Sequence, residues 1–175
     1  MTGRRPLVVG VTELLRRPAS RKPVRAQAVA EGLHVVDSRV PDGAEIDVDL
    51  ELESMADGIT VTGNVSAPWE GTCRRCLIPV SGRLEVPVRE LYQHHPTSED
   101  AFQFSGDQID LEPLVREALL LELPLAPVCS DTCAGLCPQC GANRNDVDCG
   151  HEVVVTDPRW GALDALRESL EERPD

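Results

Sequence analysis

The sequence predicts an α+β fold, in which a small antiparallel β-sheet is packed by helices and carries cysteine-rich loops. Three patterns lead to this prediction. Apolar and polar residues alternate in three separate runs, as in strands with one buried face. A later segment has apolar residues at helical spacing. Five of the seven cysteines lie between residues 129 and 149 of a chain of 175.

An antiparallel hairpin is expected over residues 44–65. Residues 44–52 alternate between aliphatic residues and acids, which predicts a strand with one buried face and one acidic, solvent-facing side. The pair Asp57-Gly58 supplies a turn signal, and the alternation resumes over residues 59–65.

A third strand is expected over residues 83–89, where apolar and charged residues alternate again. Pro87 cannot donate a hydrogen bond to a neighbouring strand, so this strand is expected at an edge or with a bulge. The connection that precedes it, residues 71–82, carries Cys73 and Cys76.

A helix is expected to begin at Asp110, which can cap it, and to tolerate Pro113 in its first turn. Its buried stripe follows the spacing i, i+3, i+4, i+7 and i+8: Leu111, Leu114, Val115, Ala118 and Leu119. Another helix is expected from Asp157-Pro158 onward. The polar segment 94–108 is expected to be a loop.

The N-terminal part differs from the rest in regularity and in charge. Prolines interrupt residues 1–43, in which residues 11–17 could form a short helix. Residues 1–30 carry seven basic side chains and one acid, whereas the remainder carries ten basic and 29 acidic ones. The expected organisation is a basic arm of residues 1–30 and a single domain of residues 31–175. Such an arm can bind an acidic partner, although a solvated tail has the same composition.

The formal net charge of −13 argues against a general nucleic-acid coat protein and against adsorption to an anionic membrane. No apolar run approaches the ~18–20 residues that span a bilayer, and no signal-peptide pattern is found. We therefore expect a cytoplasmic protein. In a reducing cytosol, an odd number of clustered cysteines indicates metal ligands or redox groups rather than disulfides.

The segment Cys137-Pro-Gln-Cys140-Gly141 has the form of a zinc knuckle. Two intervening residues let both thiolates reach one ion, and the glycine permits a tight turn whose backbone N–H groups can point at sulfur. Cys149 and His151 follow closely enough to complete a tetrahedron. One CxxC alone could also be a redox dithiol, but five cysteines and a histidine within 23 residues favour structural zinc in the segment 129–151.

Cys73-Arg-Arg-Cys76 is a second CxxC, distant in sequence. The seven cysteines and His151 make eight ligands, enough for two tetrahedral sites. In that arrangement Cys73 and Cys76 join Cys129 and Cys133, while Cys137, Cys140, Cys149 and His151 form a local site. Ligand count alone leaves one or two zinc ions open. Closed thiolate-rich sites are structural, and the sequence contains no motif of a catalytic centre, so we expect no enzyme activity.

Basic residues beside the cysteines are candidate RNA contacts. Arg74 and Arg75 lie between the first two cysteines, and Arg144 follows the knuckle. Such arginines could bind RNA or could offset the negative charge of a metal–thiolate centre, and the sequence leaves both open. With the arm, the candidate RNA-binding residues are Arg16, Arg17, Arg21, Lys22, Arg74, Arg75 and Arg144.

Taken together, these segments resemble the YceD family, whose members are named large ribosomal RNA subunit accumulation proteins. The resemblance is carried, from about residue 7 to 170, by Gly71-Thr-Cys-Arg-Arg-Cys-Leu77, by Asp110-Leu-Glu-Pro-Leu-Val-Arg-Glu117 running into Leu123-Pro-Leu-Ala-Pro127, by the cysteines from Cys129 to Cys149, and by a closing short helix. Many relatives end the cluster with Cys-x-Cys, where this chain has Cys149-Gly-His151.

The resemblance implies a non-enzymatic role in the synthesis, processing or stability of 23S rRNA and in assembly of the large ribosomal subunit. The expected activity is binding of rRNA or of a pre-ribosomal particle. The main alternative is an acidic chaperone or adaptor for a basic large-subunit ribosomal protein, since the body of the chain is acidic. A third possibility is a thiol redox enzyme that uses Cys73 and Cys76.

Overall fold

The computed structural model describes residues 7–29, 31–96, 101–151, 161 and 163. They divide into two compact units, of which the first ends at Cys133 and the second begins at Ala134. All strands and helices with the bounds given below belong to the first unit. Among the described residues, no helix has the length and apolar composition needed to cross a bilayer.

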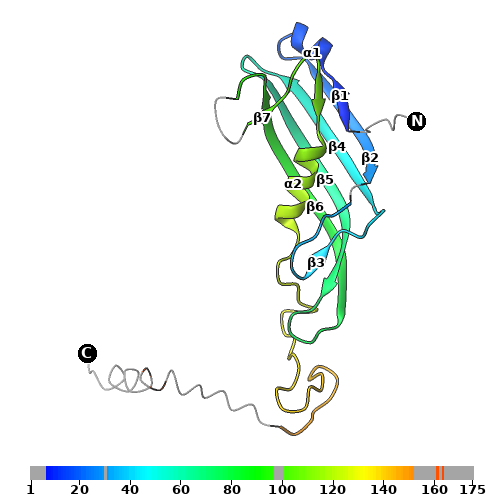
Figure 1. Cartoon of the computed structure of the whole chain (residues 1–175), viewed down its shortest axis with the longest axis vertical. Coiled ribbons are helices and arrows are strands. Elements are labelled where there is room, and N and C mark those ends of the chain that lie inside the picture. Colours follow the sequence, from blue (N-terminus) through cyan, green and yellow to red (C-terminus); the bar gives the residue numbers. More distant parts are fainter. Residues whose placement is uncertain (1–6, 30, 97–100, 152–160, 162, 164–175) are drawn as a thin grey trace. The chain divides into compact units, whose positions relative to one another are not determined.

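The first unit is built on a six-stranded sheet with the order β2-β4-β5-β6-β7, in which β3 pairs with β5 (Figure 1). The strands of this sheet are β2 (Arg21–Val29), β3 (Ser38–Arg39), β4 (Glu45–Ser54), β5 (Ile59–Thr72), β6 (Pro79–Gln93) and β7 (Phe102–Gln103). All pairs are antiparallel except β6 with β7. A separate two-stranded sheet pairs β1 (Val8–Gly10) with β8 (Gln108–Asp110), and the helices are α1 (Thr12–Arg16) and α2 (Glu112–Glu122).

The central hairpin is the one that the alternating residues predict. The apolar positions of β4 are buried and its acids face outward or are half-exposed. Strand β5 continues past the predicted run to Thr72 and pairs with β6 over its full length. Pro87 lies on the part of β6 that pairs with β5 alone in the described chain, so its edge position is confirmed.

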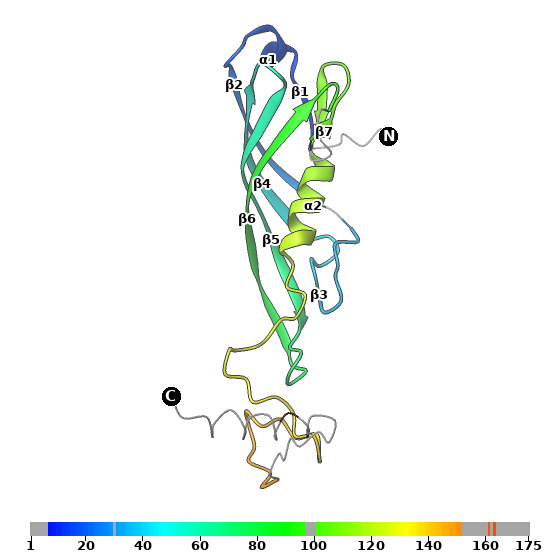
Figure 2. The same cartoon turned by 90° about the vertical axis from the view of Figure 1, so that its left-hand side faces the viewer.

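Helix α2 covers one face of the sheet (Figure 2). Leu114, Val115 and Leu119 are buried in the common core, as their helical spacing predicts. The helix begins two residues after Asp110, whose side chain still accepts a hydrogen bond from the N–H of Glu112 at 2.9 Å. Asp110 therefore satisfies one of the free N–H groups of the first turn.

Several expectations about the fold hold only in part, and one lies outside the described residues. The described chain is mostly sheet with two helices, so the expected α+β fold holds only in part. Residues 1–43 contain three strands as well as the predicted short helix, because Pro23 is compatible with the edge strand β2. The segment 94–108 contains β7 and the start of β8. The helix expected from Asp157 falls almost entirely outside the described residues.

Candidate metal centres

The first cysteine cluster joins two distant parts of the first unit. Cys73 and Cys76 lie in the turn between β5 and β6, and Cys129 and Cys133 follow α2. The four sulfur atoms lie within 4.8 Å of one another. Cys73 Sγ is 3.9 Å from Cys133 Sγ, and Cys76 Sγ is 3.6 Å from Cys129 Sγ. A tetrahedral ion with metal–sulfur bonds of about 2.3 Å requires sulfur separations of about 3.8 Å, so the cluster could hold a metal ion.

The turn that presents Cys73 and Cys76 has the hydrogen bonds of a metal knuckle. Cys73 N–H donates to the C=O of Ile78 at 2.8 Å, and Leu77 N–H donates to the C=O of Cys73 at 2.9 Å. Leu77 has φ of +61°, a left-handed conformation that glycine adopts more readily. The sequence does not reveal this knuckle, since the residue after its second cysteine is leucine.

The second cluster lies within the second unit. It contains Cys137, Cys140, Cys149 and His151, whose ligand atoms also lie within 4.8 Å of one another. Cys137 Sγ is 3.7 Å from His151 Nδ1. A tetrahedral ion bound by one sulfur and one nitrogen atom separates them by about 3.6 Å, so this cluster could hold a metal ion as well.

The second knuckle repeats the hydrogen bonds of the first. Cys137 N–H donates to the C=O of Ala142 at 2.8 Å, and Gly141 N–H donates to the C=O of Cys137 at 2.8 Å. Gly141 has φ of +73°, the role that its position in the sequence predicts. Gly150, between the last two ligands, has φ of +67° and donates its N–H to the carboxylate of Asp148. Turns therefore fix the backbone beside Cys137 and Cys140 and between Cys149 and His151.

The thiols of the first cluster differ in acidity. Burial raises the pKa of Cys73, but the backbone amides of Cys76 and Arg75 outweigh burial and lower this pKa to about 6. The backbone amide of Ile78 lowers the pKa of Cys76, yet burial and hydrogen bonds with neighbouring thiols raise it to about 12. In the second cluster, the backbone amides of Cys140 and Gln139 lower the pKa of Cys137 to about 6. Cys73 in the first cluster and Cys137 in the second are thus favoured as thiolates before any cation binds.

Arg75 connects the two halves of the first cluster. Its Nη1 donates to the C=O of Asp131 at 3.0 Å and to the C=O of Cys133 at 3.3 Å. The neighbouring Arg74 uses its backbone N–H instead, which donates to the C=O of Pro127 at 2.9 Å. The two adjacent arginines therefore differ in the use of their side chains. The Arg75 guanidinium holds the segment of Cys129 and Cys133 in position, whereas the Arg74 guanidinium does not.

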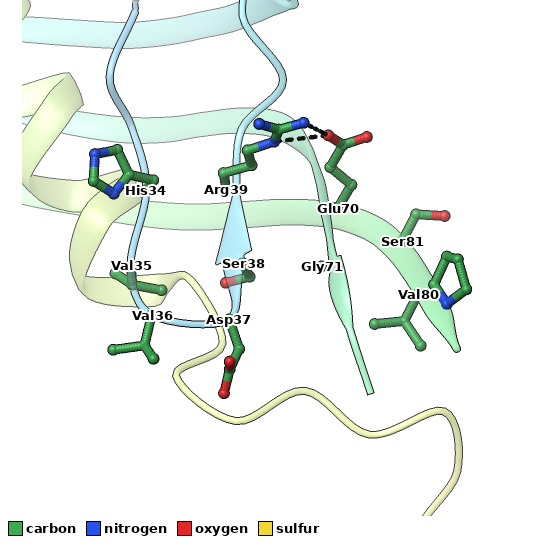
Figure 3. A pocket seen from close by; sticks show the side chains of 11 residues that line it. His34, Val35, Val36, Asp37, Ser38, Arg39, Glu70, Gly71, Val80 and Ser81 are labelled. Atoms are coloured by element: carbon green, nitrogen blue, oxygen red, sulfur yellow. Dashed lines mark hydrogen bonds and ion pairs between the residues drawn. The ribbon is translucent and has the colours of Figure 1, made fainter. Parts of the chain in front are cut away.

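A loop that the sequence did not reveal as part of the site supports the first cluster from the other side. The C=O of Asp37 accepts the N–H of Thr72, directly before Cys73, at 3.1 Å. Ser38 Oγ donates to the C=O of Pro124 at 2.7 Å. Figure 3 shows this loop beside the ends of β5 and β6, with the ion pair of Arg39 and Glu70 across the groove between them. The loop therefore fixes both chain segments that carry the ligands.

The predicted RNA-binding residues differ in whether their side chains already have partners within the protein. Arg21 forms ion pairs of 3.2 Å with Glu51 and Glu53 on β4, and Lys22 Nζ donates to the C=O of Gly10 at 2.7 Å. In the described part of the chain, the side chains of four exposed candidates have no hydrogen-bonded or ion-paired partner: Arg16, Arg17, Arg74 and Arg144. These four side chains are the ones free to contact another molecule.

The free arginines of the first unit do not form one patch. The residues after α1 pair with Ser54, at the start of the β4–β5 turn, whereas Arg74 follows the far end of β5. The 14 residues of β5 span about 45 Å at ~3.4 Å per residue. A single partner that contacts Arg16 and Arg74 must therefore extend over the length of the sheet.

Comparison with known proteins agrees with the arrangement of these elements. The family model described as large ribosomal RNA subunit accumulation protein YceD matches residues 61–167. An uncharacterized protein of Mycobacterium tuberculosis is 39% identical over 173 residues, which cover 90% of this chain and 80% of the relative. The large ribosomal RNA subunit accumulation protein YCED homolog 1, chloroplastic, of Arabidopsis thaliana is 34% identical over 79 residues, 43% of this chain and 24% of its own. No solved structure matches the chain. The matched region includes both cysteine clusters, and the chain belongs to the YceD family.

Proposed function

We propose that this protein is a non-enzymatic cytoplasmic factor for the accumulation of 23S rRNA, which binds the rRNA or a pre-ribosomal particle of the large subunit. Membership of the YceD family is the observation that carries the proposal, because the matched residues 61–167 include both knuckles and their arginines. In this role the two clusters are structural zinc centres, and the knuckles present arginine side chains to RNA.

The donor sets support a structural role for the metal. Each cluster supplies four protein ligands, which close the coordination sphere, whereas a catalytic zinc keeps one position for water or substrate. Burial of Cys73 and Cys76 is unfavourable for a redox dithiol, which must be reached by its substrate. A closed zinc centre instead fixes the backbone around Arg74, so that its side chain meets RNA with little loss of conformational entropy.

Arg74 and Arg144 are the proposed contacts to RNA at the knuckles. Both side chains are exposed, and arginine binds phosphate and stacks on unpaired bases. Arg16 and Arg17 are the proposed contacts of the arm, since Arg21 and Lys22 already have partners within the fold. Each arginine that contacts a phosphate contributes to the salt dependence of binding.

The proposal is tested by purifying the tagged protein from cells after crosslinking and sequencing the bound RNA. We expect enrichment of 23S rRNA precursors, and a reduction in the double variant Arg74→Gln, Arg144→Gln. The matched control is Arg25→Gln, because Arg25 is ion-paired with Asp49 on the sheet. Equal recovery of 23S and unrelated RNA would contradict the proposal, as would recovery of a basic ribosomal protein without RNA after nuclease treatment.

The arm requires point variants rather than a deletion. Removing residues 1–30 would take β1, α1 and β2 out of the fold, so weaker binding would have two causes. The double variant Arg16→Gln, Arg17→Gln changes exposed side chains only. We expect a smaller slope of log K against log salt, by about one for each phosphate that is no longer neutralised, and an unchanged slope would exclude the arm.

A further inference from the structure

Strand β6 has an open edge. From Pro79 to Leu91 it pairs with β5 and with no other strand in the described part of the chain. The register with β5 has no bulge, and the C=O of Gln93 accepts the N–H of Phe104 on the side away from β5. Because peptide groups alternate along a strand, those of Glu85, Pro87 and Arg89 also face the open side. Pro87 offers a C=O group but no N–H, so a further strand can pair with this edge through the N–H and C=O groups of Glu85 and Arg89 and the C=O of Pro87.

A groove runs between this edge and helix α2. Its apolar lining comes from β6, β7 and α2: Val86, Pro87, Val88, Phe102, Leu114, Ala118 and Leu121. The groove has a volume of about 230 Å³, below the ~300–1,000 Å³ of pockets that enclose small molecules. Leu121 lies beside the buried stripe of the helix, and its side chain is 79% exposed. Side chains of an extended chain fit such a groove better than a compact ligand does.

The charges of the groove all have one sign. Among the described residues its charged lining consists of Glu117 and Glu122 on α2 and Glu90 on β6, without a basic side chain. Burial raises the pKa of Tyr92, two residues beyond Glu90, and the carboxylates of Asp110, Glu90 and Glu117 raise this pKa further. A positively charged and partly apolar occupant therefore complements the groove.

We propose that the groove between β6 and α2 binds an extended, basic segment of a partner protein by addition of a strand to β6. The main chain of the segment pairs with the open edge, as in other cases of strand addition. Alternate side chains face the helix, where apolar ones pack on Leu121 and Ala118, and lysines or arginines reach Glu117 and Glu122. This inference does not rest on the proposed contacts to RNA, which lie at the knuckles and at α1.

The test uses the full zinc-loaded chain and a blocked peptide of about nine residues. Every second residue, on the face turned to the helix, is valine or lysine in turn, and threonine fills the positions between them. Amide NMR shifts on titration are expected along β6 and in α2 around Leu121. The same peptide with glutamate in place of lysine is expected not to bind. A valine–lysine peptide with N-methyl groups on alternate residues cannot form the main-chain hydrogen bonds, and we expect it to bind about tenfold more weakly or not at all.

The decisive variant is Leu121→Lys, which adds a positive charge at an exposed position and removes the apolar side chain. We expect about tenfold weaker binding of the peptide. The matched control is Val29→Lys, which makes the same change at the 58% exposed Val29 on the opposite edge strand and should leave binding unchanged. Retained far-UV dichroism and metal content show that both variants fold.

Four results would overturn the inference. Equal weakening by Val29→Lys would indicate attraction to the acidic surface as a whole. Undiminished binding of the N-methylated peptide would exclude strand addition. A dimer whose formation protects the β6 amides would assign the edge to a second copy of the chain. Displacement of the peptide by a 23S rRNA fragment would assign the groove to RNA, whereas recovery of 23S rRNA with Leu121→Lys tests the proposed function separately.

Discussion

Leu77 has a left-handed backbone conformation that costs a residue with a Cβ atom about 1 kcal/mol. Its counterpart in the second knuckle is Gly141, for which this conformation is favourable. The sequence therefore predicted the second knuckle directly, while the first was predicted only as a CxxC pair. Hydrogen bonds at Cys73, rather than the residue type at position 77, show that the two turns are alike.

Replacing Leu77 by glycine should leave the stability of the zinc-loaded protein unchanged or slightly higher. The relief of backbone strain, about 1 kcal/mol, offsets the added flexibility of the unfolded chain, and the 61% exposed side chain contributes little packing. The matched control is Ile78→Gly at the next position, which is 40% exposed and should destabilise the protein by about 1 kcal/mol because glycine makes the unfolded chain more flexible. Urea unfolding measures both, and equal destabilisation would contradict the role assigned to Leu77.

Arg75→Gln should destabilise the first cluster, and Arg74→Gln should not. The Arg75 guanidinium makes two hydrogen bonds to backbone C=O groups in the segment of Cys129 and Cys133, and removing them from a largely exposed side chain should cost about 1 kcal/mol. Competition with a chromogenic chelator should remove the metal faster from Arg75→Gln. Equal rates in both variants would show that these hydrogen bonds do not hold the cluster together.

At the scale of elements, the regular alternation of β4 and β5 made their hairpin predictable, as did the apolar stripe of α2. Strand β2 was missed because its basic residues and Pro23 suggested an arm. Those arginines instead pair with the acids of β4, and this pairing depends on a partner strand that the local sequence cannot show. The grouping of cysteines followed from ligand count, but the loop at Ser38 carried no recognisable motif.

Gly71→Ala should disturb the packing between that loop and β5. A Cβ atom at Gly71 would clash with the C=O of Asp37 and press on Ser38, so β3 must move away from β5. We expect a destabilisation of about 1–3 kcal/mol and weaker metal retention at the first cluster. Gly10→Ala is the control, because a Cβ atom there meets nothing within 4 Å. Unchanged thermal stability of Gly71→Ala would show that the loop yields without affecting the site.

At the scale of the whole molecule, the two clusters belong to different compact units, so they should bind metal independently. Protein purified without chelator should contain two zinc ions per chain by elemental analysis. Cys76→Ser and Cys140→Ser should each contain one, because each removes a ligand from one cluster only. A variant that loses both ions would contradict independent sites, and one ion in the unmodified protein would reject the two-site arrangement.

Metal retention should depend on pH in the direction that the thiols set. The pKa values of Cys73 and Cys137 are lowered from 9.0 to about 6, so both are thiolates at neutral pH and become protonated as the pH falls through about 6. Protons then compete with the metal for its ligands. We expect retention at pH 7.5 and increasing release as the pH falls below about 6, measured by dialysis and elemental analysis. Metal release that increases as the pH rises would contradict this prediction.

The two clusters also differ in when the growing chain can complete them. Cys76 and Cys129 are 53 residues apart, whereas Cys137 and His151 are 14 apart. At the ~5–20 residues per second of protein synthesis, the first pair of thiols waits about 3–10 s for its partners, and the second cluster forms within about 1–3 s. During that interval, Cys73 and Cys76 are open to oxidation or to capture of a wrong metal. The yield of correctly metallated protein should therefore depend on the speed of translation between the two halves of the first cluster.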